Sequence, residues 1–187
     1  MEMKVKDTVI PGCFEIIPSV FSDDRGSFIK TFHRGFSAEH GLVTSFAEEF
    51  YSWSKRGVIR GLHFQTPPSE QTKVVTCLSG EVLDVVVDLR VGSPTFGRHA
   101  MFTLRASEAT LLYIPPGLAH GFLVISDGAL IYYQVTSIHD PACDVGIRWD
   151  SADIKWPLAE PIISARDASF PALAEFTSPF NFNKATL

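Results

Sequence analysis

The fold follows from the stretch Lys73–Arg90, which reads KVVTCLSGEVLDVVVDLR. A short apolar run ends at Leu78 and is followed by Ser79-Gly80, a dipeptide that suits a tight hairpin turn. The run after this turn carries alternate apolar residues on one face, namely Leu83, Val85, Val87 and Leu89. Its other face carries Asp84, Asp88 and Arg90, interrupted by Val82 and Val86. A period of two residues predicts β-strands, here two strands joined by a hairpin.

Further strand-like runs recur beyond this stretch, with Gly, Pro, Ser or Asp between them. They are His99–Arg105, Ala109–Ile114, Gly121–Ile125 and Leu130–Thr136. Their spacing is typical of a sandwich or barrel. One short helix is expected near Ser37–His40, and the segment after Trp156-Pro157 is expected to wrap the barrel as loops and short turns. We predict an all-β jelly roll with short peripheral helices, formed as one domain by residues 1–187.

The composition limits the classes of partner. The chain has 187 residues, a net charge of −5 and a pI of about 5.6. General nucleic-acid and membrane-surface binders need a basic face, so neither partner is expected. Met1–Asp7 lacks the apolar run of a signal peptide, and no stretch is apolar enough to span a bilayer. Three distant cysteines, Cys13, Cys77 and Cys143, show no disulfide or zinc spacing, and we expect buried thiols in a cytoplasmic protein.

His63 is the most informative candidate for chemistry, and Arg60 and Lys73 accompany it. Strict alternation would put Arg60 and His63 on opposite faces, but Gly61 between them permits a bulge that aims both inward. Lys73 begins an otherwise apolar strand. Cationic side chains facing one cavity would attract an anion such as a pyrophosphate. The alternative is that each side chain is solvated at the end of its strand.

Three other positions have both a functional and a structural interpretation. His120 follows the turn Pro115-Pro116-Gly117, where a single histidine is more often a hydrogen-bonded structural residue than a ligand. Tyr132 and Tyr133 are neighbours on one strand and must point to opposite faces, so one can line a cavity. Asp167 lies in a late loop and would, alone, be interpreted as a surface residue.

These residues belong to a larger pattern that resembles the dTDP-4-dehydrorhamnose 3,5-epimerase family of cupin-fold enzymes. The resemblance covers most of the chain in order. Its segments are Phe21–Gly26, Gly57–Gln65, Gly80–Arg90, Gly92–Gly97, Ile114–Phe122, Trp149-Asp150 and Ile154–Pro157. It implies a homodimeric cupin-type jelly-roll barrel that epimerises a nucleotide-linked 4-keto-6-deoxy sugar at C3, C5 or both, without metal or cofactor.

The resemblance also implies roles for individual residues. His63 corresponds to the base, Asp167 to the carboxylate that holds it, and Tyr133 to the acid on the opposite face of the sugar. Lys73 is our candidate for the cation that stabilises the enolate oxygen. The remaining predicted substrate contacts are Arg25, Lys30, Arg60, His120, His139, Asp144 and Arg166.

The chain departs from the family pattern around the nucleotide. Lys30 stands where the family has a glutamate, and Glu48-Glu49-Phe50 where it has Gln-Asp-Asn. Gln134 replaces a lysine, and Ile138-His139 replaces an aromatic pair whose second tyrosine stacks on the base. We therefore expect a different nucleotide, such as CDP or GDP, or a different set of inverted carbons.

Three rival functions remain open. A metal-dependent cupin would use His63, Gln65, Glu70 and His120, although an amide is a poor transition-metal ligand. A non-catalytic sugar-nucleotide binder could share the fold. A 3,4-ketoisomerase acting on a similar substrate would move the carbonyl and leave the stereocentres unchanged.

Overall fold

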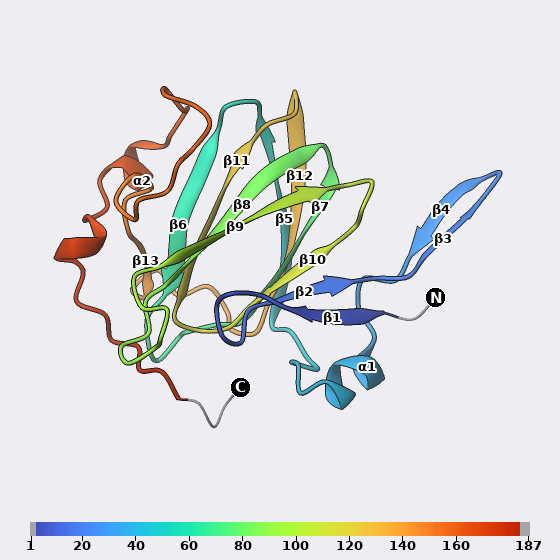
Figure 1. Cartoon of the computed structure of the whole chain (residues 1–187), viewed down its shortest axis with the longest axis horizontal. Helices are drawn as coiled ribbons and strands as arrows, with labels where there is room; N and C mark the ends of the chain where they lie inside the picture. Colours follow the sequence, from blue (N-terminus) through green and yellow to red (C-terminus); the bar gives the residue numbers. More distant parts are fainter. Residues whose placement is uncertain (1–2, 184–187) are drawn as a thin grey trace.

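Two antiparallel β-sheets packed face to face form the body of the protein, as seen in a computed structural model that describes residues 3–183 (Figure 1). In order across the first sheet lie β1 (Lys4–Asp7), β2 (Phe14–Ile17), β10 (Leu111–Ile114), β7 (Lys73–Ser79), β12 (Gly128–Val135) and β5 (Glu48–Lys55). The second sheet consists of β13 (Asp144–Gly146), β6 (Ile59–Gln65), β11 (Leu118–Val124), β8 (Glu81–Asp88) and β9 (His99–Arg105). This architecture confirms the predicted all-β jelly roll.

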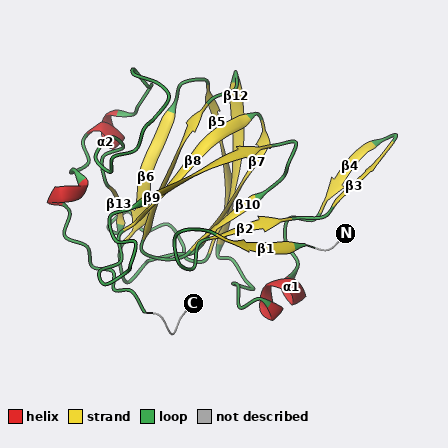
Figure 2. Ribbon diagram, in the orientation of Figure 1, coloured by secondary structure: helices red, strands yellow, loops and turns green. Residues whose placement is uncertain are grey.

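The helices are short and peripheral, as predicted (Figure 2). They are α1 (Arg34–Glu39), α2 (Ala165–Ala168) and the single-turn 3₁₀ helix η1 (Leu173–Glu175). The expected helix near Ser37–His40 is confirmed and begins earlier, because the His33 imidazole accepts a hydrogen bond from the Phe36 N–H and caps it. Histidine is not among the preferred N-cap residues, so the sequence did not indicate this start.

The turn at Ser79-Gly80 does not make the predicted hairpin. β7 lies in the six-stranded sheet and β8 in the five-stranded sheet, so the turn carries the chain across the sandwich. Val75 and Cys77 on β7 and Val82 and Val86 on β8 pack into the same core. Strands that pair within a sheet and strands that face each other across a core share the same alternation, so periodicity cannot separate the two cases.

Both faces of β8 are buried, which explains why both are largely apolar. Val82 and Val86 point into the sandwich, whereas Val85 and Val87 join a second cluster with Phe180 from the C-terminal segment. The segment after Trp156-Pro157 therefore wraps the five-stranded sheet, as predicted (Figure 1). Residues 1–2 and 184–187 of the predicted domain lie outside the described residues.

A hairpin of two four-residue strands, β3 (Val20–Asp23) and β4 (Gly26–Ile29), projects from the body (Figure 1). Its Phe21 and Phe28 are exposed. These strands and β1 and β2 are too short for a recognisable alternation, and the sequence did not predict them.

The three cysteines are buried and free, and among residues 3–183 no helix is long and apolar enough to cross a membrane.

Candidate active site

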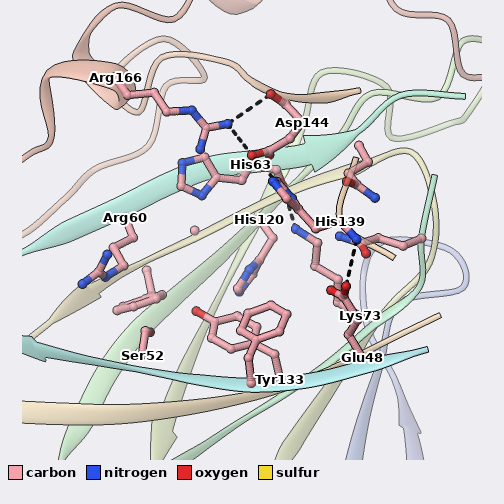
Figure 3. A pocket seen from close by; sticks show the side chains of 15 residues that line it. Glu48, Ser52, Arg60, His63, Lys73, His120, Tyr133, His139, Asp144 and Arg166 are labelled. Carbon is pink, nitrogen blue, oxygen red and sulfur yellow. Dashed lines mark hydrogen bonds and ion pairs between the residues drawn. The ribbon is translucent and has the colours of Figure 1, made fainter. Parts of the chain in front are cut away.

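A cavity of about 250 Å³ opens between the two sheets. It collects most of the predicted site residues: Arg60, His63, Lys73, His120, Tyr133, His139, Asp144 and Arg166 (Figure 3). Asp167 is buried behind His63, to which it is hydrogen-bonded. The cavity is therefore assembled from strands of both sheets and from the α2 region.

A β-bulge at Gly61 turns Arg60 and His63 toward the same cavity, as the sequence suggested. His120 and Phe122 of β11 pair with His63 and Arg60 of β6. The chain therefore advances three residues along β6 and only two along β11 between these pairs. Gly61 has φ = +122°, a conformation that L side chains rarely adopt. The extra residue shifts the alternation by one position and so brings two side chains of one strand into one pocket.

Substituting Gly61 by alanine should destabilise the fold. A Cβ at this position would lie 2.7 Å from Gly121 Cα and 2.7 Å from the His120 carbonyl oxygen. The clash and the backbone conformation together should lower the free energy of unfolding by about 2 to 4 kcal/mol. Gly97→Ala is the matched control, because Gly97 also has positive φ but faces open space. Denaturant unfolding measures both, and equal losses would contradict the steric argument.

His63 forms a dyad with Asp167. The His63 Nε2 atom lies 2.9 Å from Asp167 Oδ1, and the Gly61 N–H donates to Oδ2 at 2.9 Å. Burial alone would raise the pKa of Asp167, but the hydrogen bonds from His63 and Gly61, together with the charge of His63 and a contact with Ser164, hold the pKa below its usual value. An ionised carboxylate accepts from Nε2–H, so the Nδ1 lone pair of His63 is left free to take a proton.

A second dyad, which the sequence analysis missed, lies directly beside the first. The His120 Nε2 atom is 2.8 Å from Asp84 Oδ2, and both side chains are almost fully buried. Asp84 belongs to the inward face of β8, between Val82 and Val86. A carboxylate between two core valines was the available signal, since such a group needs a partner when buried.

Tyr133 approaches the cavity from the other sheet. His63 is on β6 of the five-stranded sheet and Tyr133 on β12 of the six-stranded sheet. Figure 3 shows them on opposite sides of the pocket with His120 between them, and the rings of His120 and Tyr133 are 6.2 Å apart, edge to face. Burial raises the pKa of Tyr133, so the phenol stays protonated at neutral pH. Tyr132 points to the other face, as predicted.

Lys73 and Arg60 supply positive charge along the walls. The Lys73 ammonium donates to the His63 carbonyl oxygen at 3.2 Å. Desolvation lowers the pKa of Lys73 to about 8, with Asp144 and Asp84 opposing the shift. The Arg60 Nε atom donates to Ser54 Oγ at 2.8 Å, which holds the guanidinium along the wall. Both cations can meet an anionic ligand.

The rim of the cavity carries paired charges. Arg166 lies 2.7 Å from Asp144, and His139 Nδ1 lies 3.9 Å from the same carboxylate (Figure 3). The Glu48 carboxylate accepts a hydrogen bond from the backbone N–H of His139 at 3.1 Å. The sequence identified Glu48 only as a departure from the family pattern, and the structure adds it to the lining.

Two predicted substrate contacts lie elsewhere on the chain. Arg25 is at the tip of the β3–β4 hairpin, where its guanidinium pairs with Asp23 at 2.5 Å and remains largely exposed. Lys30 follows β4 and lines a separate surface hollow beside His33, the N-cap residue of α1. Neither lines this cavity, so their contacts with substrate stay predictions.

Three of the four residues of the metal-cupin alternative are engaged in other contacts. The Gln65 amide donates to the Ser69 carbonyl and accepts from the Asp140 N–H. The Nε2 atoms of His63 and His120 face Asp167 and Asp84. Within residues 3–183, no group of three or more His, Cys, Asp or Glu side chains could hold a metal ion.

Comparison with known proteins fits this geometry. Residues 7–175 match the sequence model of a family described as dTDP-4-dehydrorhamnose 3,5-epimerase. The dTDP-4-dehydrorhamnose 3,5-epimerase of Shigella flexneri is 40% identical over 168 residues, which cover 88% of this chain and 93% of that enzyme.

Solved structures of related enzymes have the same fold. The dTDP-6-deoxy-D-glucose-3,5-epimerase of Legionella pneumophila, in complex with dTDP-4-keto-L-rhamnose, has a TM-score of 0.92 and 34% identity, covering 97% of this chain and 100% of that chain. ChmJ, a 3′-monoepimerase from Streptomyces bikiniensis in complex with dTDP-quinovose, has a TM-score of 0.85 and 35% identity, covering 90% and 87%. On this sequence and structural similarity, the chain belongs to the dTDP-4-dehydrorhamnose 3,5-epimerase family and is a carbohydrate isomerase.

Proposed function

We propose that this protein inverts C3, C5 or both of a nucleotide-linked 4-keto-6-deoxy sugar by proton transfer through an enolate. His63 Nδ1 removes the proton from the carbon next to the ketone, and the C–H electrons move to the carbonyl oxygen. The Lys73 ammonium stabilises that oxygen in a partly dry pocket. Tyr133 then donates its proton to the opposite face of the carbon, and a proton from solvent returns to the phenol while the imidazolium loses its own.

One observation carries the proposal: a histidine backed by a carboxylate and a protonated tyrosine approach the same cavity from opposite sheets. Inversion needs a proton removed from one face and another delivered to the other face. Related enzymes were solved in complex with dTDP-4-keto-L-rhamnose, which is a ligand of the proposed class, and with dTDP-quinovose, a nucleotide-linked 6-deoxy sugar.

The test is NMR of dTDP-4-dehydro-6-deoxyglucose incubated with the protein in D2O. We expect deuterium at C3 or C5 together with inversion at the labelled carbon. A carbonyl moved to C3 would instead support a 3,4-ketoisomerase. If no carbon exchanges with any nucleotide form, the protein is a binding module.

The pH dependence of turnover tests the role of Lys73. A lysine whose pKa is about 8 is cationic below that pH and loses its charge as the pH rises through it. We therefore expect kcat/KM to fall above pH 8. In Lys73→Arg the cation persists, because arginine stays protonated throughout this range. That variant should have lower activity but a flat profile to pH 9, and an unchanged alkaline limb would argue against the assignment.

We further propose that the nucleotide differs from dTDP. The support is the rim, where Glu48, His139 and Asp144 surround the outer part of the cavity with charge. A carboxylate accepts hydrogen bonds, so it suits an amino-bearing base such as cytosine or guanine better than thymine. Calorimetric titrations with dTDP, CDP and GDP decide this, and a clear preference for dTDP would reject it.

We also propose a homodimer. An isolated two-stranded hairpin is marginally stable in water, yet β3–β4 projects with Phe21 and Phe28 exposed. Packing against a second copy would bury these rings and could bring Arg25 to the partner's cavity. Sedimentation equilibrium should give twice the chain mass, whereas a monomer at micromolar concentration would contradict the proposal.

The single domain over residues 1–187 and the cytoplasmic location also remain proposals. Limited proteolysis should leave one resistant core, and cell fractionation should recover the protein with cytoplasmic markers. Two stable fragments, or recovery with the membrane fraction, would contradict them.

A further inference from the structure

Phe50 is stacked on the ring of Tyr133. The two residues are direct partners across the β5–β12 pair, so their side chains share the inward face of the sheet. Their ring centroids are 4.8 Å apart with 19° between the planes. Phe50 is 45% exposed and Tyr133 only 9% exposed, although both line the cavity. The phenyl ring thus covers a face of the phenol that would otherwise meet solvent.

A second ring restrains the same phenol. The imidazole of His120 meets the Tyr133 ring edge to face at 6.2 Å and 74°. His120 is itself fixed by two contacts of its Nε2 with the Asp84 carboxylate, at 3.0 and 2.8 Å. The Tyr133 ring is therefore held by Phe50 on β5 and His120 on β11, one from each sheet.

From this arrangement we infer that Phe50 is a positioning residue for the proton donor, which it holds against the sugar by stacking on Tyr133. The inference rests on the proposed function, because it gives Tyr133 the role of acid. In this scheme, no atom of Phe50 contacts the reacting carbon. Its effect passes through the orientation of the phenol and through the exclusion of water from one face of that ring.

Removing the Phe50 ring should change the fraction of the enolate that gives each of two products. If the imidazolium of His63 returns a solvent-derived proton to the original face, the carbon is exchanged but not inverted. If Tyr133 delivers its proton to the other face, the carbon is inverted. When the Tyr133 phenol is displaced, it donates its proton less often and the His63 imidazolium returns one more often. The ratio of exchanged to inverted product therefore measures how well Tyr133 is held.

The experiment compares Phe50→Leu and Phe50→Tyr with the wild type by NMR in D2O. Leucine keeps the site apolar but removes the ring, and tyrosine keeps the ring. An aromatic pair contributes a free energy equivalent to a change of about two- to tenfold. We expect Phe50→Leu to raise the exchanged-to-inverted ratio by about that factor, and Phe50→Tyr to restore it to within about twofold of wild type.

Phe96→Leu is the matched control. Phe96 is 49% exposed and lies in the loop between β8 and β9, away from the cavity, so losing its ring should leave the ratio unchanged. A thermal melt of each variant confirms that the fold is retained. An unchanged ratio in Phe50→Leu, or a Phe50→Tyr variant that behaves like Phe50→Leu, would overturn the inference.

The wild-type result and the variant result separate the proposed function from the role of Phe50. If the wild type neither exchanges nor inverts any candidate substrate, the proposed function is wrong and the inference falls with it. If the wild type exchanges and inverts while Phe50→Leu keeps the wild-type ratio, the function stands and only the role of Phe50 is rejected.

Discussion

Replacing His63 by alanine should abolish the exchange of substrate hydrogen for deuterium. The imidazole Nδ1 is the proposed base, and its Nε2 is held 2.9 Å from Asp167 Oδ1. Loss of a positioned general base typically lowers the rate by about 10² to 10⁴-fold. We expect kcat to fall by at least about 10³-fold, measured as deuterium incorporation by NMR. Binding of the nucleotide sugar should persist, because Arg60 and Lys73 are unchanged.

Asp167→Asn provides the companion measurement. The amide keeps the size of the carboxylate but removes the charge that offsets the imidazolium, so this variant should exchange more slowly than wild type and faster than His63→Ala. Wild-type exchange by His63→Ala would remove the histidine from the mechanism. Wild-type exchange by Asp167→Asn would reject a catalytic contribution of the dyad.

Tyr133→Phe should separate exchange from inversion. The substitution removes one hydroxyl and keeps the ring that stacks on Phe50 at 4.8 Å. His63 can still remove the proton, so exchange should stay within a few-fold of wild type. Inversion should fall by about 10²-fold or more, because the opposite face has lost its donor. The readout is the yield of inverted sugar relative to labelled, uninverted sugar in D2O.

Tyr132→Phe is the control for this prediction. It removes a hydroxyl from the neighbouring residue, which points to the outer face of the same strand, and should leave both rates unchanged. If Tyr133→Phe loses exchange and inversion equally, the phenol has a role in proton removal and the two-face scheme must be revised. If both rates persist, another group delivers the proton.

The second dyad suggests why the cavity tolerates burial of so many polar groups. His120 and His63 are register partners on neighbouring strands, and each presents its Nε2 to a buried carboxylate. Burial is the largest influence on Asp84 and raises its pKa overall, although the charge of His120 and its hydrogen bond act in the opposite direction. Each buried acid is thereby matched with a hydrogen-bond donor, which is the condition for burying a charge at tolerable cost.

Alternation of apolar residues sufficed to predict the strands between residues 73 and 136 and a sandwich or barrel, and the family resemblance added the jelly roll. The strand His99–Arg105 has the predicted bounds, and those of β11 and β12 differ by a few residues. Gly61 also indicated the bulge, because only a break in alternation lets Arg60 and His63 share a cavity. These features depend on neighbours along the chain, which is why the sequence alone could specify them.

The tertiary structure decided which strands meet and which distant side chains become partners. Asp167 is 104 residues from His63, Asp84 is 36 residues from His120, and Phe50 reaches Tyr133 only through the pairing of β5 with β12. Alternation tells which face of a strand is apolar, but not whether the next strand lies beside it or across the core. The hairpin expected at Ser79-Gly80 became a crossing between sheets for that reason, since the choice depends on packing of the whole core and not on any local run of residues.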